Sequence, residues 1–351
     1  MKLVAVSDTF MKERYYRDAV AEHPGFTLTH AVSFGVEDKA LMRKTAYKIE
    51  RGGPEAVPAP EEFYALAPEA EAVMVHLCPV TRRFIASAPN LKLIMVNRGG
   101  TENIDIEAAT EYGIPVLSNP AHNANGVTEL TVGLMLAESR NIVRSNNAMK
   151  AGGWREDYPD TGHEYELRGL KVGIVGFGNI GRRVARILSA FGCRLCFTDP
   201  NVPADDPDAI AVGCRKTTLA ELMSTCDFVT LHARTNEVVI GREDFALMKP
   251  TAYFINTARP HLIDSKALYE MLRDRRITGA ALDVHDAEPT DPADPMLTLD
   301  NVTLTSHRGG QSVNCYSDSP GMIMTEAEKL LAGRDDVKFF VNRHIRRKEH
   351  S

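Results

Sequence analysis

The sequence has too few cysteines for a disulfide scaffold, because only six are spread over 351 residues. No apolar run approaches the length of a transmembrane helix. The formal net charge is −6, so there is no excess of positive charge to favour nucleic acid or an anionic membrane, and we expect neither as a partner. The apolar run at the start is too short for a signal peptide, so we expect a cytoplasmic protein.

Four of the cysteines have a spacing that invites comparison with a zinc site. Cys193 and Cys196 form a Cys-x-x-Cys pair, and Cys214 and Cys226 follow. The first two fall on or beside one predicted strand and Cys226 opens another, so the four thiols are poorly placed to converge on a tetrahedral ion. The sequence therefore favours free, buried or half-buried thiols and no metal site.

The composition is that of an ordinary globular protein, with 44% apolar and 25% charged residues. The chain is long enough for two domains, each with its own core. Strand-like and helix-like segments alternate over the first 118 residues, which predicts a parallel sheet with helices on both faces. The predicted strands are 2–6, 26–32, 72–77, 93–96 and 115–117, and the predicted helices are 10–23, 37–49 and 104–112.

A glycine-rich turn follows a short apolar strand near the middle of the chain. Gly176, Gly178 and Gly181 come directly after the apolar run 172–175, and a helical pattern begins at Arg182. A strand, a glycine turn and a helix N-terminus together bring backbone N–H groups to the pyrophosphate of a dinucleotide. The cofactor-binding residues predicted here are Gly176, Phe177, Gly178, Asn179, Ile180 and Gly181.

Asp199 indicates which dinucleotide is bound. It ends the next apolar run, at the place where an acid accepts hydrogen bonds from the adenosine ribose hydroxyls. The same carboxylate would repel a 2′-phosphate. The sequence therefore predicts NAD rather than NADP as the cofactor.

The segments around this turn complete a second α/β pattern. Six predicted strands fit a full dinucleotide fold: 171–175, 194–198, 227–231, 252–256, 279–284 and 302–305. Helices are predicted over 264–273 and 320–331, and a long helical segment with an apolar stripe over 126–150. Residues 119–122 are a plausible hinge, and 151–168 a surface loop.

From about Leu91 to Gly333 the chain resembles the D-isomer-specific 2-hydroxyacid dehydrogenase family, in particular its phosphoglycerate dehydrogenase and glyoxylate/hydroxypyruvate reductase members. Five motifs in the family's order carry the resemblance: RGGTENID from Arg98, the glycine turn with Asp199, NTAR ending at Arg259 with Asp264, LDV from Leu282 with Glu288-Pro289, and SHRGG from Ser306. The resemblance implies two doubly wound parallel-sheet domains. A Rossmann NAD-binding domain (120–310) would be inserted into a flavodoxin-like substrate domain (1–119 with 311–351), and the cleft between them would close over NAD and substrate.

By this resemblance the catalytic residues are Arg259, Glu288 and His307 of an NAD-dependent oxidoreductase. Their chemistry also suits the reaction. Moving hydride to or from a 2-hydroxy carbon requires a proton at the hydroxyl oxygen, and histidine exchanges protons near neutral pH. A carboxylate on its other nitrogen fixes the tautomer and favours the imidazolium. A guanidinium is the natural planar partner of the substrate carboxylate.

Further residues are expected to line the site. In the turn Arg98-Gly99-Gly100 successive N–H groups can face the substrate carboxylate. The expected opposite wall is His76-Leu77-Cys78-Pro79, in particular Leu77 and Cys78. Asp283 resembles the family's acid that holds the nicotinamide carboxamide. The remaining cofactor contacts implied by the resemblance are His232, Ala233, Thr257, Ala258 and Gly309.

Some expectations stay open at this point. Pro260 follows Arg259 where the family usually has glycine, so the arginine could be aimed differently. Arg98 and Arg308 could favour a substrate with a second anionic group. The family implies a homodimer, and the apolar stretch 126–142 is compatible with one, but a buried intrachain helix explains it equally well. An alternative function is an NAD-sensing, co-repressor-like binding protein on the same scaffold.

Overall fold

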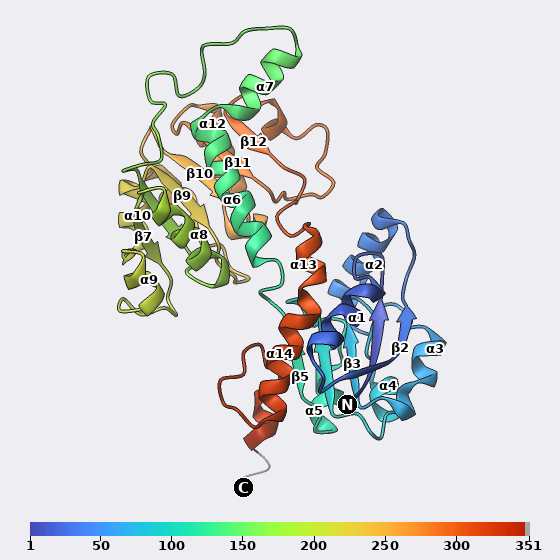
Figure 1. Ribbon diagram of the computed structural model, residues 1–351. Coiled ribbons are helices and arrows are strands. Elements are labelled where there is room, and N and C mark those ends of the chain that lie inside the picture. The colour runs from blue at the N-terminus through green and yellow to red at the C-terminus, as the bar shows by residue number, and fades with distance from the viewer. Residues whose placement is uncertain (348–351) are drawn as a thin grey trace. The chain divides into compact units, whose positions relative to one another are not determined.

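The computed structural model describes residues 1–347 and divides the chain into two compact units. Unit 1 comprises Met1–Asn123 and the residues from Ser312 onward, and unit 2 comprises Ala124–Gln311. Each unit is built on a parallel sheet with helices against it, so the predicted class of two parallel-sheet α/β domains is confirmed (Figure 1). Residues 348–351, the end of the segment 311–351 assigned from sequence to the substrate domain, lie outside the described residues.

Unit 1 contains a five-stranded sheet in the order β2-β1-β3-β4-β5, which is the flavodoxin-like order. The strands are β1 (Lys2–Ser7), β2 (Thr27–Ser33), β3 (Ala72–Val75), β4 (Leu93–Val96) and β5 (Val116–Ser118). The helices are α1 (Glu13–Glu22), α2 (Lys39–Gly52), α3 (Glu61–Ala65), α4 (Arg82–Ala86), α5 (Ile106–Glu111), α13 (Val313–Ser317) and α14 (Ser319–Leu331). Short 3₁₀ turns lie at η1 (Ala67–Glu69) and η4 (Arg343–Arg347).

Both faces of this sheet are buried, which explains why its central strands are continuous apolar runs. Alternate residues of β1 point to opposite faces: Val4 and Val6 pack with α2 and α4, whereas Leu3 and Ala5 pack with α1 and α14. Helix α14 therefore returns from the far end of the chain to complete the core of unit 1 (Figure 1).

Unit 2 contains a seven-stranded sheet in the order β12-β11-β10-β9-β6-β7-β8. Its strands are β6 (Lys171–Val175), β7 (Arg194–Thr198), β8 (Arg215–Lys216), β9 (Phe228–Leu231), β10 (Tyr253–Asn256), β11 (Gly279–Leu282) and β12 (Val302–Leu304). Six of them correspond to the six predicted strands. The seventh, β8, is a two-residue edge strand whose polar residues give no apolar pattern to detect.

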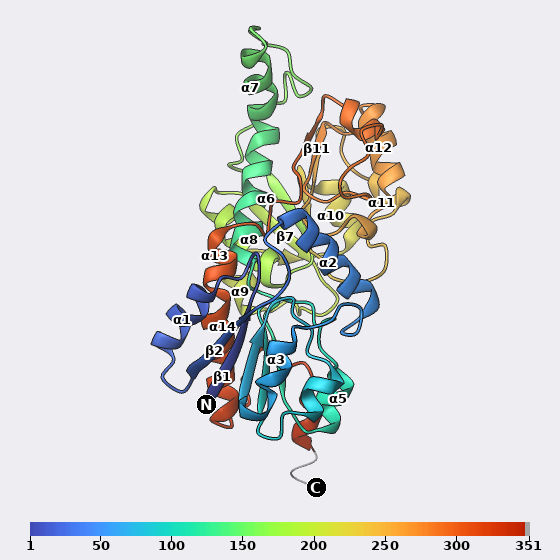
Figure 2. The ribbon, with the colours of Figure 1, turned by 90° about the vertical axis from the view of Figure 1, so that its right-hand side faces the viewer.

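Helices cover both faces of the larger sheet (Figure 2). The helices of unit 2 are α6 (Ala124–Ser139), α7 (Ile142–Lys150), α8 (Asn179–Ala190), α9 (Pro207–Ala211), α10 (Leu219–Thr225), α11 (Arg242–Ala246) and α12 (Ser265–Arg273), with 3₁₀ turns η2 (Pro260–Leu262) and η3 (Pro295–Thr298). Helix α7 extends beyond the sheet (Figure 2). The apolar stripe of α6 is buried within unit 2, where Leu134 and Met135 pack beside Val172. Intrachain packing therefore explains that stripe.

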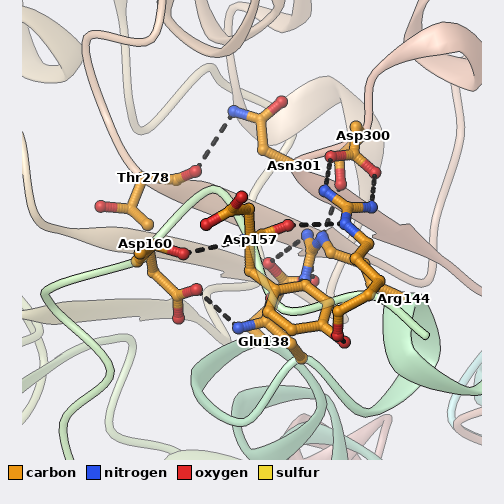
Figure 3. A network of polar contacts seen from close by, with 11 residues as sticks. Glu138, Arg144, Asp157, Asp160, Thr278, Asp300 and Asn301 are labelled. Atoms are coloured by element: carbon orange, nitrogen blue, oxygen red, sulfur yellow. Dashed lines mark hydrogen bonds and ion pairs between the residues drawn. The ribbon is translucent and has the colours of Figure 1, made fainter.

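The predicted helical segment 126–150 is two helices, because Asn141 adopts a left-handed conformation with φ of 50°. A buried polar network surrounds this break (Figure 3). Arg144 Nη2 lies 3.0 Å from Glu138 Oε2, and Arg144 Nε donates to the carbonyl of Asp300. Burial raises the pKa of Glu138 to about 7, against the opposing effect of Arg144. Asn141 donates its amide to Asp160, which ties the following loop to the same network.

All six cysteines are free, and five are buried. Cys196 Sγ lies 3.4 Å from Cys226 Sγ. Within residues 1–347 there is no group of three or more histidine, cysteine, aspartate or glutamate side chains that could hold a metal ion. In the same range no helix is long and apolar enough to cross a membrane.

Candidate active site

The glycine turn joins β6 to α8, and two of its three glycines are required by close backbone contacts. Gly176 has φ of 92°, and a Cβ there would lie 2.5 Å from the backbone nitrogen of Ala233. A Cβ on Gly181 would lie 2.2 Å from the carbonyl oxygen of Gly176. A Cβ on Gly178 would meet nothing within 4 Å. Two glycines therefore permit close backbone packing, and the third leaves open space before the N-terminus of α8, as a pyrophosphate requires.

Asp199 directly follows β7 and reaches back to the glycine turn. Its Oδ2 accepts the backbone N–H of Phe177 at 2.8 Å, and its Oδ1 accepts that of Asn201 at 2.8 Å. The Phe177 side chain is buried and stacks on Phe197 with ring centroids 4.2 Å apart. The fold thus brings the predicted acid to the predicted turn, where Phe177 presents only its backbone.

His232 and Ala233 follow β9, beside Gly176. The Nε2 atom of His232 lies 3.0 Å from the hydroxyl of Thr230. Its Nδ1 atom is buried and has no hydrogen-bond partner within residues 1–347. Burial lowers the pKa of His232 to about 3, so the ring is neutral at physiological pH. The unpartnered Nδ1 of His232 beside the glycine turn, together with the carboxylate of Asp199, suits the binding of a polar dinucleotide.

The loop after β10 carries Thr257, Ala258 and Arg259. Asn256 organises it, because its Oδ1 accepts the N–H of Ala258 and its Nδ2 donates to the carbonyl of Arg259. Thr257 is buried, with its hydroxyl 2.8 Å from that of Thr131 in α6. The Arg259 side chain is exposed, and its Nη1 donates to the carbonyl of Ala258. Its guanidinium is therefore accessible to a carboxylate.

Pro260 does not distort the backbone of Arg259. Arg259 is extended, with φ of −147°, and Pro260 is the first residue of the 3₁₀ turn η2. Proline is well tolerated at the first position of a helical turn, where its missing N–H has no partner to lose. The 3₁₀ turn η2 therefore accommodates proline at the position where the family usually has glycine.

His307 and Glu288 lie in contact. Nδ1 of His307 is 2.8 Å from Oε2 and 3.0 Å from Oε1 of Glu288. The His307 side chain is 43% exposed, and φ is 52° at this residue. The backbone N–H of His285 also donates to Glu288. With Nδ1 engaged by the carboxylate, Nε2 is the nitrogen that can exchange a proton with a ligand.

Asp283 holds the loop on both sides of His307. Its side chain is buried and accepts three hydrogen bonds: from the Thr305 hydroxyl at 2.5 Å, the Arg308 N–H at 2.7 Å and the Gly309 N–H at 2.8 Å. The packing at Gly309 is close, because a Cβ there would lie 3.1 Å from Asp283 Oδ2. Sequence reasoning missed this clamp and the roles of Thr305 and His285, because their partners are largely backbone atoms that leave no sequence signal.

The predicted substrate residues of unit 1 lie at the carboxyl ends of neighbouring strands. Leu77 and Cys78 are buried just after β3, and Arg98, Gly99 and Gly100 follow β4. The Arg98 guanidinium lies 2.5 Å from Glu50 and 3.5 Å from Glu102. Arg98 is therefore neutralised by carboxylates of its own unit. In unit 2, Arg308 donates to the side chain of Gln311.

Comparison with known proteins identifies the family. Residues 132–309 match the family model described as "D-isomer specific 2-hydroxyacid dehydrogenase, NAD binding domain". The chain belongs to the D-isomer-specific 2-hydroxyacid dehydrogenase family. The glycine turn, Asp199, Glu288 and His307 therefore lie in the family's NAD-binding domain, and the substrate residues predicted around β3 and β4 lie outside the matched range.

Relatives of this chain are named for different activities. The chain is 40% identical over 260 residues to the D-3-phosphoglycerate dehydrogenase of Methanocaldococcus jannaschii, a match that covers 72% of this chain but only about half, 48%, of that relative. It is 37% identical to the hydroxypyruvate reductase of Thermotoga maritima, over 72% of this chain and 82% of the relative.

Solved structures share the fold of this chain. The NAD-complexed D-isomer-specific 2-hydroxyacid dehydrogenase of Lactobacillus delbrueckii ssp. bulgaricus has a TM-score of 0.76 at 20% identity, covering 97% of this chain and 100% of that one. At this identity the likeness supports the fold.

Proposed function

We propose that this chain is an NAD-dependent D-2-hydroxyacid dehydrogenase, which transfers hydride between NAD(H) and a D-2-hydroxy acid/2-keto acid pair. The observation that carries the proposal is the contact between His307 and Glu288, in a loop that Asp283 holds from both sides. This is the acid–base pair that the CH–OH chemistry needs, within the NAD-binding domain of an enzyme family.

In the proposed reaction His307 handles the proton. In the reductive direction Nε2 donates a proton to the carbonyl oxygen of the keto acid, and in the oxidative direction it removes one from the hydroxyl. Glu288 keeps the Nδ1 proton in place, which fixes the tautomer and stabilises the charge on the ring. When bound, NAD(H) accepts or supplies the hydride.

Arg259 is proposed to orient the substrate. Its guanidinium can bind the carboxylate of a 2-keto acid with two parallel hydrogen bonds, and its present partner is only a backbone carbonyl. Leu77, Cys78, Arg98, Gly99 and Gly100 are proposed to contribute to substrate binding, as the family resemblance implies. Arg98 would do so through its backbone, because its side chain is held by Glu50 and Glu102.

The cofactor is proposed to bind along the glycine turn of unit 2. Backbone N–H groups at the start of α8 would bind its pyrophosphate and Asp199 its adenosine ribose. The proposed contacts are Gly176, Phe177, Gly178, Asn179, Ile180, Gly181, Asp199, His232, Ala233, Thr257, Ala258, Asp283 and Gly309. Residues 120–310 are thus the proposed NAD-binding domain, and 1–119 with 311–351 the proposed substrate domain, of a cytoplasmic enzyme.

A homodimer is proposed from the exposed apolar side chains of unit 2. Ile142 and Met149 on α7 are each 53% exposed, and Trp154 in the following loop is 78% exposed. The apolar stripe of α6 is buried within the unit and is not available to a partner. We therefore propose that these exposed side chains form the interface with a second copy of the chain. Analytical ultracentrifugation of the full chain tests this, with Trp154→Ser expected to weaken a dimer; a monomeric wild-type chain contradicts it.

The alternative, an NAD-sensing binding protein without significant turnover, is favoured less because the pair His307–Glu288 is intact. An NADH-oxidation screen separates the two. It uses glyoxylate, hydroxypyruvate, 3-phosphohydroxypyruvate and sugar-derived keto acids, each repeated with NADPH. We expect turnover of at least one keto acid with NADH. NADH binding without turnover of any of them would favour the sensing protein.

A further inference from the structure

His307 has a backbone conformation that is unusual for a residue other than glycine. Its φ is 52°, in the left-handed region, where the Cβ of an L-residue crowds the following carbonyl oxygen. A residue stays in such a conformation only when the surrounding structure holds it there. The turn that presents the imidazole of His307 must therefore be fixed by contacts with the residues around it.

Thr305, which comes just before this turn, connects it to the sheet. The N–H of Thr305 donates to the carbonyl of Leu282 at 3.0 Å, which continues the pairing of β12 with β11. Its hydroxyl donates to the carboxylate of Asp283. Its carbonyl accepts the N–H of His307 at 3.0 Å, and this hydrogen bond closes the turn. The direction of the Thr305 carbonyl therefore determines where the backbone of His307 lies.

The ring of His285 makes a second hydrogen bond to the same carbonyl. His285 lies shortly after β11, and its Nε2 is 2.8 Å from the carbonyl oxygen of Thr305. A carbonyl oxygen can only accept a hydrogen bond, so Nε2 of His285 is the nitrogen that carries a proton in this contact. The side chain of His285 thus holds the carbonyl to which the N–H of His307 is also bound.

The backbone of His285 contacts the other member of the acid–base pair. The N–H of His285 donates to Oε1 of Glu288 at 3.2 Å, and the same oxygen lies 3.0 Å from Nδ1 of His307. The main chain of His285 therefore holds the carboxylate, while its ring holds the backbone from which the imidazole of His307 extends. One residue is in this way connected to both partners of the contact between His307 and Glu288.

We propose that His285 is a positioning residue of the proposed reaction. Its Nε2–H holds the carbonyl of Thr305 and thereby keeps His307 in the conformation in which the imidazole meets Glu288. The inference rests on the proposed function, since it concerns the proton that His307 exchanges with the keto acid. His285 exchanges no proton itself, and it acts on the rate of proton transfer through the placement of His307.

Three variants separate the hydrogen bond of His285 from the presence of its ring. His285→Gln places an amide nitrogen close to the position of Nε2, so the side chain can still donate to the carbonyl of Thr305. His285→Asn carries the same amide on a chain that is shorter by one methylene group, so the amide does not reach that carbonyl. His285→Phe keeps a planar ring and has no donor.

We expect kcat to depend on the donor. In His285→Asn and His285→Phe kcat should fall by about tenfold, because a small displacement of the proton donor slows the transfer. The solvent isotope effect on kcat should rise in these two variants, since proton transfer then limits the rate more strongly. In His285→Gln kcat should stay within about twofold of the wild-type value.

Binding should change little in all three variants, because Arg259 and the glycine turn are untouched. The KM for the keto acid and the dissociation constant for NADH measure this, and they separate a loss of proton transfer from a loss of binding. His30→Phe, at an exposed histidine on β2, is the control and should leave kcat and KM at the wild-type values. Thermal unfolding of each variant shows whether the fold is retained.

Each outcome decides a different point. A wild-type kcat in His285→Phe or His285→Asn contradicts the inference and leaves the proposed function standing. An equal loss of kcat in His285→Gln and His285→Asn also contradicts it, because the loss then does not depend on the donor. If neither His285→Phe nor His285→Asn folds, the contact is needed for the fold and the positioning role is contradicted. A wild-type chain that reduces no keto acid contradicts the proposed function itself.

Discussion

The imidazole of His307 lies against the carboxylate of Glu288, with Nδ1 2.8 Å from Oε2. The pair is only partly buried, so a ligand can reach the histidine while the glutamate holds it. Hydrogen bonds to Asp283 fix the backbone that presents the ring. The position of the ring is thus set before any substrate arrives, which is what proton transfer in a confined site requires.

Replacing Glu288 with Gln is expected to lower kcat by about tenfold to a hundredfold, because the amide cannot stabilise positive charge on His307. Steady-state kinetics with NADH and a keto acid measures kcat. The matched control is Glu328→Gln, which removes another glutamate in contact with a histidine, His23, and should leave kcat unchanged.

Replacing Asp283 with Ala is expected to lower kcat by at least about tenfold, because the N–H groups of Arg308 and Gly309 lose their shared acceptor. Stability should fall by about 1–3 kcal/mol for the unsatisfied donors, as measured by urea unfolding. A variant with the wild-type kcat and reduced stability would show that the clamp supports the fold without positioning His307.

Replacing Asp199 with Ala is expected to relax the preference for NADH over NADPH. The carboxylate no longer repels a 2′-phosphate, so the ratio of kcat/KM values should move toward NADPH by on the order of tenfold. Asp205→Ala, at an exposed aspartate in the same region, is the control. An unchanged ratio in Asp199→Ala would remove this residue from cofactor selection.

Replacing Arg144 with Met is expected to destabilise the chain by about 3–5 kcal/mol, because it leaves the buried Glu138 without its counterion. Arg155→Met breaks an ion pair with Asp300 that is more exposed, and should cost about 1 kcal/mol or less. Chemical unfolding of both variants gives the comparison. If both variants lost the same free energy of unfolding, the buried network would not be the stronger contributor to stability.

Much of the fold can be predicted from the sequence, because local patterns determine it. The strand 93–96 and the strand, turn and helix around Gly176 follow from apolar runs and glycine spacing, and the structure places them there. The break between α6 and α7 was missed, because the left-handed conformation of Asn141 is fixed by its buried neighbours and leaves the apolar periodicity unchanged. The edge strand β8 was missed because two polar residues carry no pattern.

Residues of the candidate site that belong to a sequence motif could be predicted. Ion pairs between residues that are distant in the sequence could not. Glu288 and His307 were paired from their types, and the structure places them in contact. Arg98 was expected to add free positive charge, but Glu50 lies 48 residues earlier in the chain and neutralises it. The contact of Asp8 with His76 likewise joins two strands that are adjacent only in the folded sheet. Such pairings depend on sheet order, which residue spacing does not reveal.

The most direct measurement is the rate of NADH oxidation by His307→Gln, with a keto acid that the wild-type chain reduces. Because the proton donor is lost while the glycine turn is untouched, kcat should fall by about two to four orders of magnitude. The dissociation constant for NADH, measured by fluorescence, should stay close to that of the wild-type chain. A variant with the wild-type kcat would contradict the proposed role of His307 and with it the proposed mechanism.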